Sequence, residues 1–197
     1  MAVLTEQRLK ELRLVSNRVV RAKDFARTAH QGQTRDDGAE YFSHPSRVVD
    51  RVRGYSGDEN TICAAWLHDT IEDCEGVTSE MLQDLFGSQV TSIVEELTLP
   101  EIPSKISPPH RWQYKTDLLV KKAGTMSNEA KLVKICDRID NLNSAMTDWK
   151  PRRLVRYAIQ GCKMLEAMRP LDPMHQQAAN DLLFLIAQIL IENQQSS

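Results

Sequence analysis

Residues 61–73 read "TICAAWLHDTIED", an apolar run that ends in one imidazole and three carboxylates. The apolar part is typical of a buried helix, whereas buried carboxylates cost free energy unless a cation or a substrate compensates them. If the helix continues, a spacing of four places His68 over Glu72. The same spacing places Asp69 over Asp73. We therefore expect the four side chains to converge at the end of this helix, where His68 and Asp69 can share a cation.

The donor types of this cluster favour particular ions. Imidazole and carboxylate groups without thiolates suit Mn²⁺, Fe²⁺ or Zn²⁺ rather than a structural zinc ion held by cysteines. Two further residues are candidates to complete a site: His44 in "SHPS" and Asp137 in "KLVKICDRIDNL". Alone, each has an ordinary structural interpretation, as a cap or surface histidine and as a salt-bridge partner beside Arg138. Only their combination with the His-Asp doublet indicates a metal centre.

The N-terminal half reads as helices joined by short loops. Apolar residues recur at helical spacing over residues 6–30, and "SHPSRVVDRV" offers Ser43 as an N-cap with a proline in the first turn. Gly57 precedes the helix that carries residues 61–73. Capped short helices are predicted in "VTSEMLQDLFG" and "SQVTSIVEELT".

The C-terminal half is also predicted to be helical. Further helices are expected around residues 110–123, 127–146, 151–168 and 174–193. The segment 99–110, "LPEIPSKISPPH", holds four prolines and is either a binding loop or a plain surface connection. The run "LLFLIAQILI" is apolar on more than one face, so it is either centrally buried or part of a homodimer interface. Since no strand alternation is convincing, the sequence predicts an all-α fold.

Length and composition restrict the class of protein. A chain of 197 residues suits one domain, and a net charge of −2 without a dominant basic block speaks against nucleic-acid binding. Four cysteines without CxxC spacing indicate free thiols in a reducing compartment. No apolar stretch of 18 residues occurs, and the N-terminus lacks the apolar core of a signal peptide. We expect a soluble cytoplasmic protein that does not associate with a membrane.

Four segments occur in an order that resembles a known family: "HQGQTRDDGAEYFSHP", "AAWLHDTIED", "FGSQV" and "KLVKICDRIDNL". The ordered histidine, His-Asp doublet and later aspartate resemble the HD phosphohydrolase superfamily. The longer segments look like the hydrolase domain of RelA/SpoT-type alarmone enzymes and of stand-alone small alarmone hydrolases. The resemblance covers roughly residues 20–145. It implies a single HD-type helical bundle over residues 1–197 with a central metal site, completed by helices over 151–193.

The resemblance also implies roles for individual residues. The implied metal ligands are His44, His68, Asp69 and Asp137, with Mn²⁺ as the usual ion of the family and other divalent ions open. Glu72 and Asp73 match the pair that positions and activates the attacking water. The implied substrate-binding residues are Arg35, which packs against the nucleobase, Asn141, and Ser144 on the ribose side. The expected activity is metal-dependent removal of the 3′-pyrophosphate from (p)ppGpp, (p)ppApp or both, with a small nucleotide as the only partner besides a second copy of the chain.

One departure from the family pattern leaves the base open. Relatives commonly carry a second basic residue after the base-packing arginine, whereas Arg35 is followed by Asp36 and Asp37. A carboxylate there accepts hydrogen bonds and favours an exocyclic amino group of adenine or guanine. An HD-type phosphatase that acts on NADPH, dNTPs or nucleoside monophosphates is an alternative, because specificity depends on few pocket contacts. A non-catalytic alarmone-binding module is a second alternative, which the presence of Glu72 and Asp73 disfavours.

Overall fold

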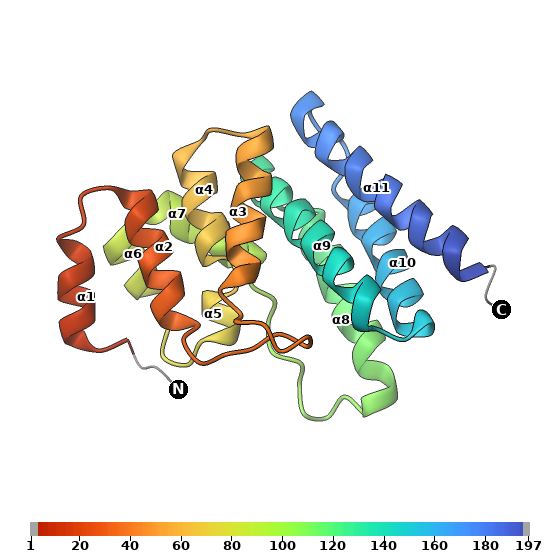
Figure 1. Cartoon of the computed structure of the whole chain (residues 1–197), viewed down its shortest axis with the longest axis horizontal. Helices are drawn as coiled ribbons and strands as arrows, with labels where there is room; N and C mark the ends of the chain where they lie inside the picture. The colour runs from red at the N-terminus through yellow and green to blue at the C-terminus, as the bar shows by residue number, and fades with distance from the viewer. Residues whose placement is uncertain (1–3, 195–197) are drawn as a thin grey trace. The chain divides into compact units, whose positions relative to one another are not determined.

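A computed structural model describes residues 4–194, which form helices joined by loops (Figure 1). Within that range no strand forms, although an isolated β-bridge pairs Thr34 with Glu40. The predicted all-α class is therefore confirmed. None of the helices in the described part of the chain is long and apolar enough to cross a membrane. The chain divides into two compact units, Met1–Thr98 and Leu99–Ser197.

The first unit is built around one helix, α4 (Glu59–Leu67), that is buried from Thr61 to its end. Its helices are α1 (Glu6–Arg13), α2 (Arg18–Ala29), α3 (Ser43–Tyr55), α4 (Glu59–Leu67), α5 (Thr70–Asp73), α6 (Ser79–Phe86) and α7 (Ser88–Leu97). Helix α4 packs against α2, α3 and α7, and every residue from Thr61 to Leu67 is buried. The apolar run therefore lies in the core, as the sequence predicts.

Two boundaries in the first unit differ from the prediction. The helix expected over residues 6–30 is wrong, because α1 ends at Arg13 and α2 begins at Arg18. Asn17 caps α2, and its side chain accepts a hydrogen bond from the Val20 amide at 3.0 Å. Ser43 as an N-cap is also wrong. The residue before α3, Phe42, already has helical dihedral angles (φ −56°, ψ −23°), so Ser43 is the first helical residue.

The helix predicted to carry the whole stretch 61–73 is broken in its middle. Helix α4 ends at Leu67, and only a short helix, α5, follows from Thr70. The hydroxyl of Thr70 donates to the Leu67 carbonyl at 2.7 Å, and Nδ1 of His68 lies 2.9 Å from the Ala65 carbonyl. In a continuous α-helix, both carbonyls would accept hydrogen bonds from the backbone amides four residues further on. Side-chain hydrogen bonds therefore replace backbone bonds at the point where the ionisable residues begin.

The second unit contains four long helices that follow the sequence prediction closely. They are α8 (Pro108–Ala123), α9 (Asn128–Asp148), α10 (Pro151–Ala167) and α11 (Pro173–Gln194). Helix α10 packs against α8, α9 and α11, and α11 also packs against α9 (Figure 1). Helix α8 begins two residues earlier than predicted, because its two prolines suit the first turn, where the missing amide hydrogens have no helical partner.

The last helix is buried on one face only. Leu182, Ile186 and Ile189 are in the core of the second unit. Phe184 and Ile191 are 76% and 58% exposed. Central burial therefore accounts for only part of "LLFLIAQILI", and the opposite face presents large apolar side chains to solvent.

Candidate metal centre

Three predicted metal ligands come together in the first unit. One donor atom from each of His44, His68 and Asp69 lies within 4.8 Å of the others. The two Nε2 atoms are 3.2 Å apart, and Oδ2 of Asp69 lies 3.1 Å from Nε2 of His68 and 3.5 Å from Nε2 of His44. Both imidazoles are buried, whereas the Asp69 side chain keeps 19% exposure. Asp69 is thus the most exposed member of the cluster.

The break between α4 and α5 places two of these ligands. His68 is the C-cap of α4, and Asp69 occupies the turn with φ −101° and ψ −3°. His44 comes from the first turn of α3, which packs against α4. A turn at residues 68–69 therefore interrupts the helix that the sequence predicted, and the doublet still reaches one point.

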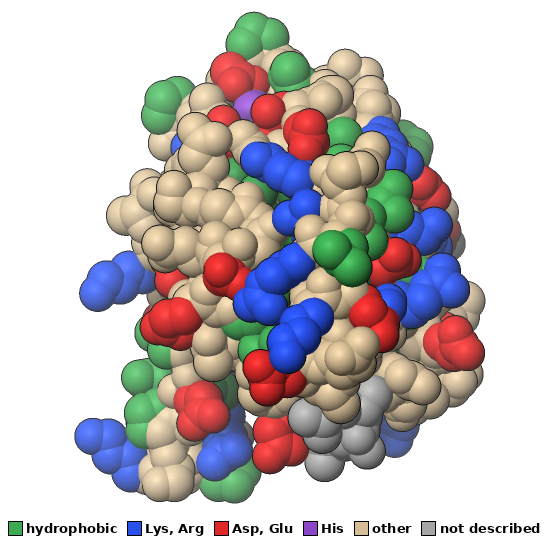
Figure 2. Space-filling model, turned by 90° about the vertical axis from the view of Figure 1, so that its left-hand side faces the viewer, with side chains coloured by type: hydrophobic (Ala, Val, Ile, Leu, Met, Phe, Trp, Pro, Cys, Tyr) green, Lys and Arg blue, Asp and Glu red, His purple; other side chains and the backbone are tan. Residues whose placement is uncertain are grey.

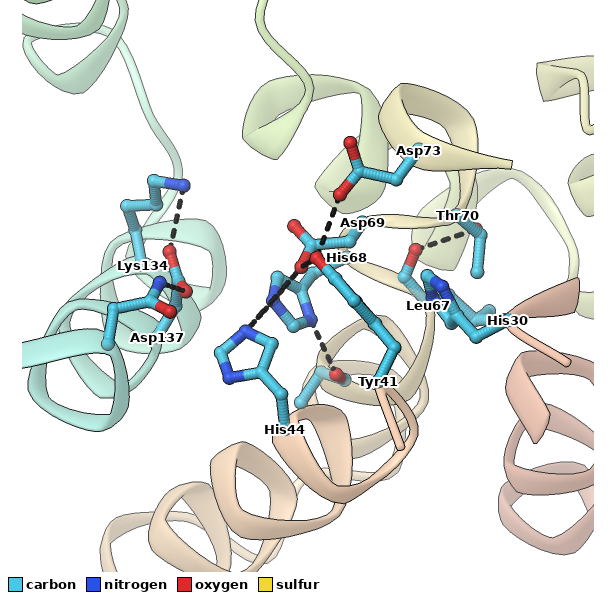
Figure 3. A network of polar contacts seen from close by, with 12 residues as sticks. His30, Tyr41, His44, Leu67, His68, Asp69, Thr70, Asp73, Lys134 and Asp137 are labelled. Atoms are coloured by element: carbon cyan, nitrogen blue, oxygen red, sulfur yellow. Dashed lines mark hydrogen bonds and ion pairs between the residues drawn. The ribbon is translucent and has the colours of Figure 1, made fainter. Parts of the chain in front are cut away.

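The hydrogen bonding of His68 indicates which kind of ion suits the cluster. A carbonyl oxygen only accepts, so Nδ1 of His68 carries the hydrogen that is donated to Ala65 (Figure 3). In the neutral ring, Nε2 then directs a lone pair toward the carboxylate oxygen of Asp69. Two acceptors at 3.1 Å repel each other unless a cation or a second proton lies between them. The imidazole and carboxylate donors therefore fit a divalent metal ion.

Tyr41 connects the ligand cluster to one of the predicted catalytic carboxylates. Its hydroxyl lies 2.7 Å from Oδ2 of Asp69 and 2.8 Å from Oδ2 of Asp73 (Figure 3). Burial, followed by the charges of Asp69 and Asp73, raises the pKa of Tyr41 far above its usual value, so the hydroxyl stays protonated. The sequence reasoning did not single out Tyr41. Its position three residues before His44 was the available signal.

His30 and Gln33 support this arrangement from outside the ligand cluster. The His30 ring stacks on Tyr41 at 4.5 Å, and its Nδ1 lies 2.8 Å from Oε1 of Gln33. The side-chain amide of Gln33 donates a hydrogen bond to the main-chain carbonyl of Asp73 at 2.8 Å. Burial lowers the pKa of His30 and keeps the ring neutral. Gln33 therefore ties the loop before α3 to α5, and sequence reasoning missed this role too.

The two predicted catalytic carboxylates are placed differently. Both side chains are exposed, and Asp73 reaches the cluster of His44, His68 and Asp69 through the Tyr41 hydroxyl. The sequence predicts that all four ionisable side chains of residues 68–73 converge. Asp73 does so through the Tyr41 hydroxyl, which also contacts Asp69. The role of Glu72 stays a prediction.

Arg35 lies in the loop that also carries Tyr41. Its guanidinium carbon is 5.9 Å from the centre of the Tyr41 ring. The loop is closed by hydrogen bonds between Arg35 and Ala39 and between Gly38 and Arg35, each 2.9 Å. Asp37 accepts a hydrogen bond from the Ala39 amide at 2.9 Å, so it stabilises the turn.

The remaining predicted residues lie in the second unit, on α9. Asp137 is buried, with Nζ of Lys134 2.9 Å from Oδ2, and its Oδ1 accepts a hydrogen bond from the Asn141 side chain. Its partner is thus Lys134 rather than the adjacent Arg138, which bonds to Gln160 at 2.9 Å. Ser144 follows Asn141 by three residues and is half-buried. Asp137, Asn141 and Ser144 therefore follow one another along successive turns of one helix.

Together, the helical fold and the cluster of His44, His68 and Asp69 define an all-α protein with a candidate divalent-metal centre. The family model described as HD domain matches residues 22–163. This chain belongs to the HD domain family.

Curated relatives support the same family, and a solved structure shows the same fold. The chain is 30% identical over 177 residues to the mouse guanosine-3′,5′-bis(diphosphate) 3′-pyrophosphohydrolase MESH1, with 83% of this chain and 92% of that protein covered. It is 35% identical over 132 residues to a probable enzyme of the same name from Mycoplasma pneumoniae, with 64% of this chain covered. A solved structure described as a metazoan orthologue of SpoT that hydrolyses ppGpp aligns with a TM-score of 0.71 at 24% identity, covering 85% of this chain and 94% of that one.

Coverage of these relatives is uneven. The chain spans only about a fifth of the length of the first bacterial relatives it matches, at 18%, 18% and 21%. It spans nearly all of the mouse protein. The shared region therefore corresponds to one part of the bacterial proteins.

Proposed function

We propose that this protein is a metal-dependent 3′-pyrophosphohydrolase of alarmone nucleotides, acting on (p)ppGpp, (p)ppApp or both. The observation that carries the proposal is the convergence of His44, His68 and Asp69, with Asp73 joined to them through Tyr41. A relative that shares 92% of its length with this chain has the corresponding name, which favours alarmones over other phosphorylated nucleotides.

The proposed ligands of the ion are His44, His68, Asp69 and Asp137, with Mn²⁺ as the ion. The donor chemistry of the first three supports their assignment. Asp137 is assigned on the resemblance of "KLVKICDRIDNL" to the family motif. When bound, such an ion lowers the pKa of water and polarises a phosphoryl oxygen.

The chain's own residues supply the other parts of the reaction. Asp73 and Glu72 orient the attacking water, and a carboxylate of this pair accepts its proton. Arg35 packs against the nucleobase, and Asn141 and Ser144 contact the substrate. The products are pyrophosphate and a nucleotide that retains its 5′-phosphates.

Further properties are proposed for the whole chain. We propose one HD-type domain over residues 1–197, because the family match at 22–163 continues across the division between the two units. The four cysteines are free thiols, which supports a reducing compartment such as the cytoplasm. A nucleotide suits the surface better than a nucleic acid does, since basic and acidic side chains are interspersed on the face shown in Figure 2.

A substrate panel tests the proposed reaction. Purified protein, shown by metal analysis to hold Mn²⁺, is incubated with pppGpp, ppGpp, pppApp and ppApp, and with NADPH, dNTPs and nucleoside monophosphates in parallel. We expect pyrophosphate release from at least one alarmone and slower turnover of the other compounds. His68→Ala, prepared identically, is the control for contaminating phosphatases. If metal-loaded protein turns over none of the four alarmones, the proposed function is wrong.

A further inference from the structure

We propose that Tyr41 is a positioning residue of the metal centre, whose hydroxyl holds the ligand Asp69 and the water-handling Asp73 at a defined separation. The part that concerns Asp69 depends only on metal binding. The part that concerns Asp73 rests on the proposed function.

The contacts of the hydroxyl carry the proposal. The phenol oxygen lies 2.7 Å from Oδ2 of Asp69 and 2.8 Å from Oδ2 of Asp73, both ordinary hydrogen-bond lengths. Asp69 is in the turn after α4, whereas Asp73 is the last residue of α5. One side chain thus links the two carboxylates from a separate segment of the chain.

The ring of Tyr41 is held in place from several sides. It stacks on buried His30 with an interplanar angle of 19°, and its edge meets the ring of His44 at 6.0 Å. The backbone amide of Tyr41 donates to the Gln33 carbonyl at 3.0 Å, and its carbonyl accepts from the His44 amide at 2.9 Å. A ring fixed in this way defines the position of its oxygen, and therefore of the two carboxylates that bond to it.

The Tyr41 hydroxyl can form a hydrogen bond with Asp73 whether Asp73 is ionised or protonated. A phenol has one hydrogen, so it donates to only one of the two carboxylates at a time. When both carboxylates are ionised, Asp69 and Asp73 accept this hydrogen in turn. After Asp73 has taken the proton of the attacking water, its own O–H donates to the phenol oxygen, and the phenol hydrogen turns to Asp69. The phenol neither gains nor loses a proton in this exchange, because it receives one hydrogen bond and donates one.

Replacing Tyr41 by phenylalanine distinguishes a role of the hydroxyl from a role of the ring in packing. Tyr41→Phe retains the ring that stacks on His30 and removes only the oxygen. Tyr55→Phe is the matched control, because it removes one phenol oxygen from the far end of α3, the helix that carries His44. A packing role alone would leave metal affinity and turnover unchanged in both variants.

The test measures Mn²⁺ affinity and turnover separately. Free Mn²⁺ is followed by electron paramagnetic resonance during titration of the wild type, Tyr41→Phe and Tyr55→Phe. We expect Tyr41→Phe to weaken Mn²⁺ binding about 10- to 100-fold, the usual effect of removing an outer partner of a ligand. Tyr55→Phe should bind as the wild type does. Circular dichroism and thermal unfolding at saturating Mn²⁺ check that both variants are folded.

The kinetic measurement addresses Asp73. At saturating Mn²⁺ and alarmone, we expect kcat of Tyr41→Phe to fall about tenfold or more with KM nearly unchanged. The effects of Tyr41→Phe and Asp73→Asn on kcat should be non-additive, because the two groups act as a unit. Unchanged Mn²⁺ affinity in Tyr41→Phe would overturn the link to Asp69, and additive effects on kcat would overturn the link to Asp73. If the wild type hydrolyses no alarmone, the proposed reaction fails while the Mn²⁺ titration still decides the role of Tyr41.

Discussion

The two nitrogens of His68 have different partners, and this difference gives the residue its chemistry. Nδ1 is anchored on the Ala65 carbonyl, and Nε2 meets His44 and Asp69. A hydrogen bond on one nitrogen sets the tautomer and directs the lone pair of the other. The orientation of the His68 ring is therefore fixed by the protein itself.

Removing a ligand should remove the ion and lower thermal stability. We expect His68→Ala and Asp137→Ala to lose Mn²⁺ and to unfold at lower temperature, because an ion that binds only the native state stabilises it. Metal analysis and thermal unfolding with and without Mn²⁺ measure both effects. His110→Ala, which removes an exposed histidine, is the control. A variant of His68 that retains stoichiometric Mn²⁺ would contradict its assignment as a ligand.

Substitution of the proposed catalytic carboxylates, Glu72 and Asp73, should lower turnover without removing the metal ion. We expect Glu72→Gln and Asp73→Asn to keep the fold and the Mn²⁺ ion while kcat falls by roughly 10²–10⁴-fold, or about 3–5 kcal/mol of barrier. Each amide preserves the size of the side chain and cannot act as a base. Steady-state kinetics with parallel metal analysis measure the effect. A double variant that is active with metal bound would show that both carboxylates are ordinary surface groups.

His30 should make stability depend on pH. Burial lowers its pKa below 6.5 in the folded protein, so the unfolded chain takes up a proton more readily. Its contribution to stability is therefore complete above about pH 6.5 and is lost as the pH falls through the lower folded pKa. Urea unfolding of metal-free protein between about pH 7.5 and about pH 5.5 should show a smaller loss in His30→Gln than in the wild type. Equal slopes would mean that other groups cause the acid sensitivity.

At the scale of helices, the ends of the helices and the turns between them decide where the side chains of the site point. Helix α6 ends at Phe86, and Gly87 follows with φ +84° and ψ 167°. A side chain at Gly87 would meet no atom within 4 Å, so the backbone conformation rather than space requires glycine. This explains the glycine of "FGSQV" as a requirement of the turn between α6 and α7.

Gly87→Ala should therefore destabilise the fold without changing the chemistry. We expect a loss of about 1–3 kcal/mol in the free energy of unfolding, the cost of holding alanine in a region of backbone space used by glycine. Gly54→Ala is the matched control. Gly54 lies inside α3 with no positive φ, so alanine should leave stability unchanged or raise it by about 0.5–1 kcal/mol. Urea unfolding compares the two, and equal losses would argue against a conformational cause.

At the scale of the whole molecule, the exposed face of α11 is the feature that the proposed reaction does not use. Residues 182–191, "LLFLIAQILI", carry no charge, and Phe184 and Ile191 are largely exposed. If the α11 helices of two copies paired antiparallel, residues 182–191 of one copy would lie against the same residues of the other. The two helices would then cross near Ala187. We propose a homodimer through this face, since self-complementarity is what a two-fold interface requires.

Solution mass measurements test the dimer. We expect the 22.4 kDa chain to have twice that mass in light scattering after gel filtration. Phe184→Ser should shift the protein toward the monomer, because it removes the most exposed apolar side chain of α11. Gln188→Ser, on the same helix, is the control. A wild type that stays monomeric at about 100 μM would contradict the interface.

Much of the helical framework could be predicted from the sequence because local signals mark it. Prolines at the starts of α8 and α10 and the capping Thr78 before α6 are visible in the chain, and the structure confirms these helices. The His-Asp doublet was also predictable as part of a candidate metal centre, since it follows an apolar run that has to be buried. These features depend on neighbours within a few residues.

Spacing rules missed the break at His68, which local side-chain hydrogen bonds accompany, and tertiary structure alone brought Tyr41 to the two carboxylates. The spacing rules assumed that the backbone bonds of α4 continue, whereas the side chains of His68 and Thr70 occupy the carbonyls that the next turn needs. Tyr41 bonds to carboxylates 28 and 32 residues away in the sequence. No periodicity or local propensity encodes such a contact, because it exists only after loop and helices have packed. The sequence by itself thus determined which groups could form the centre, and only packing decided which atoms meet.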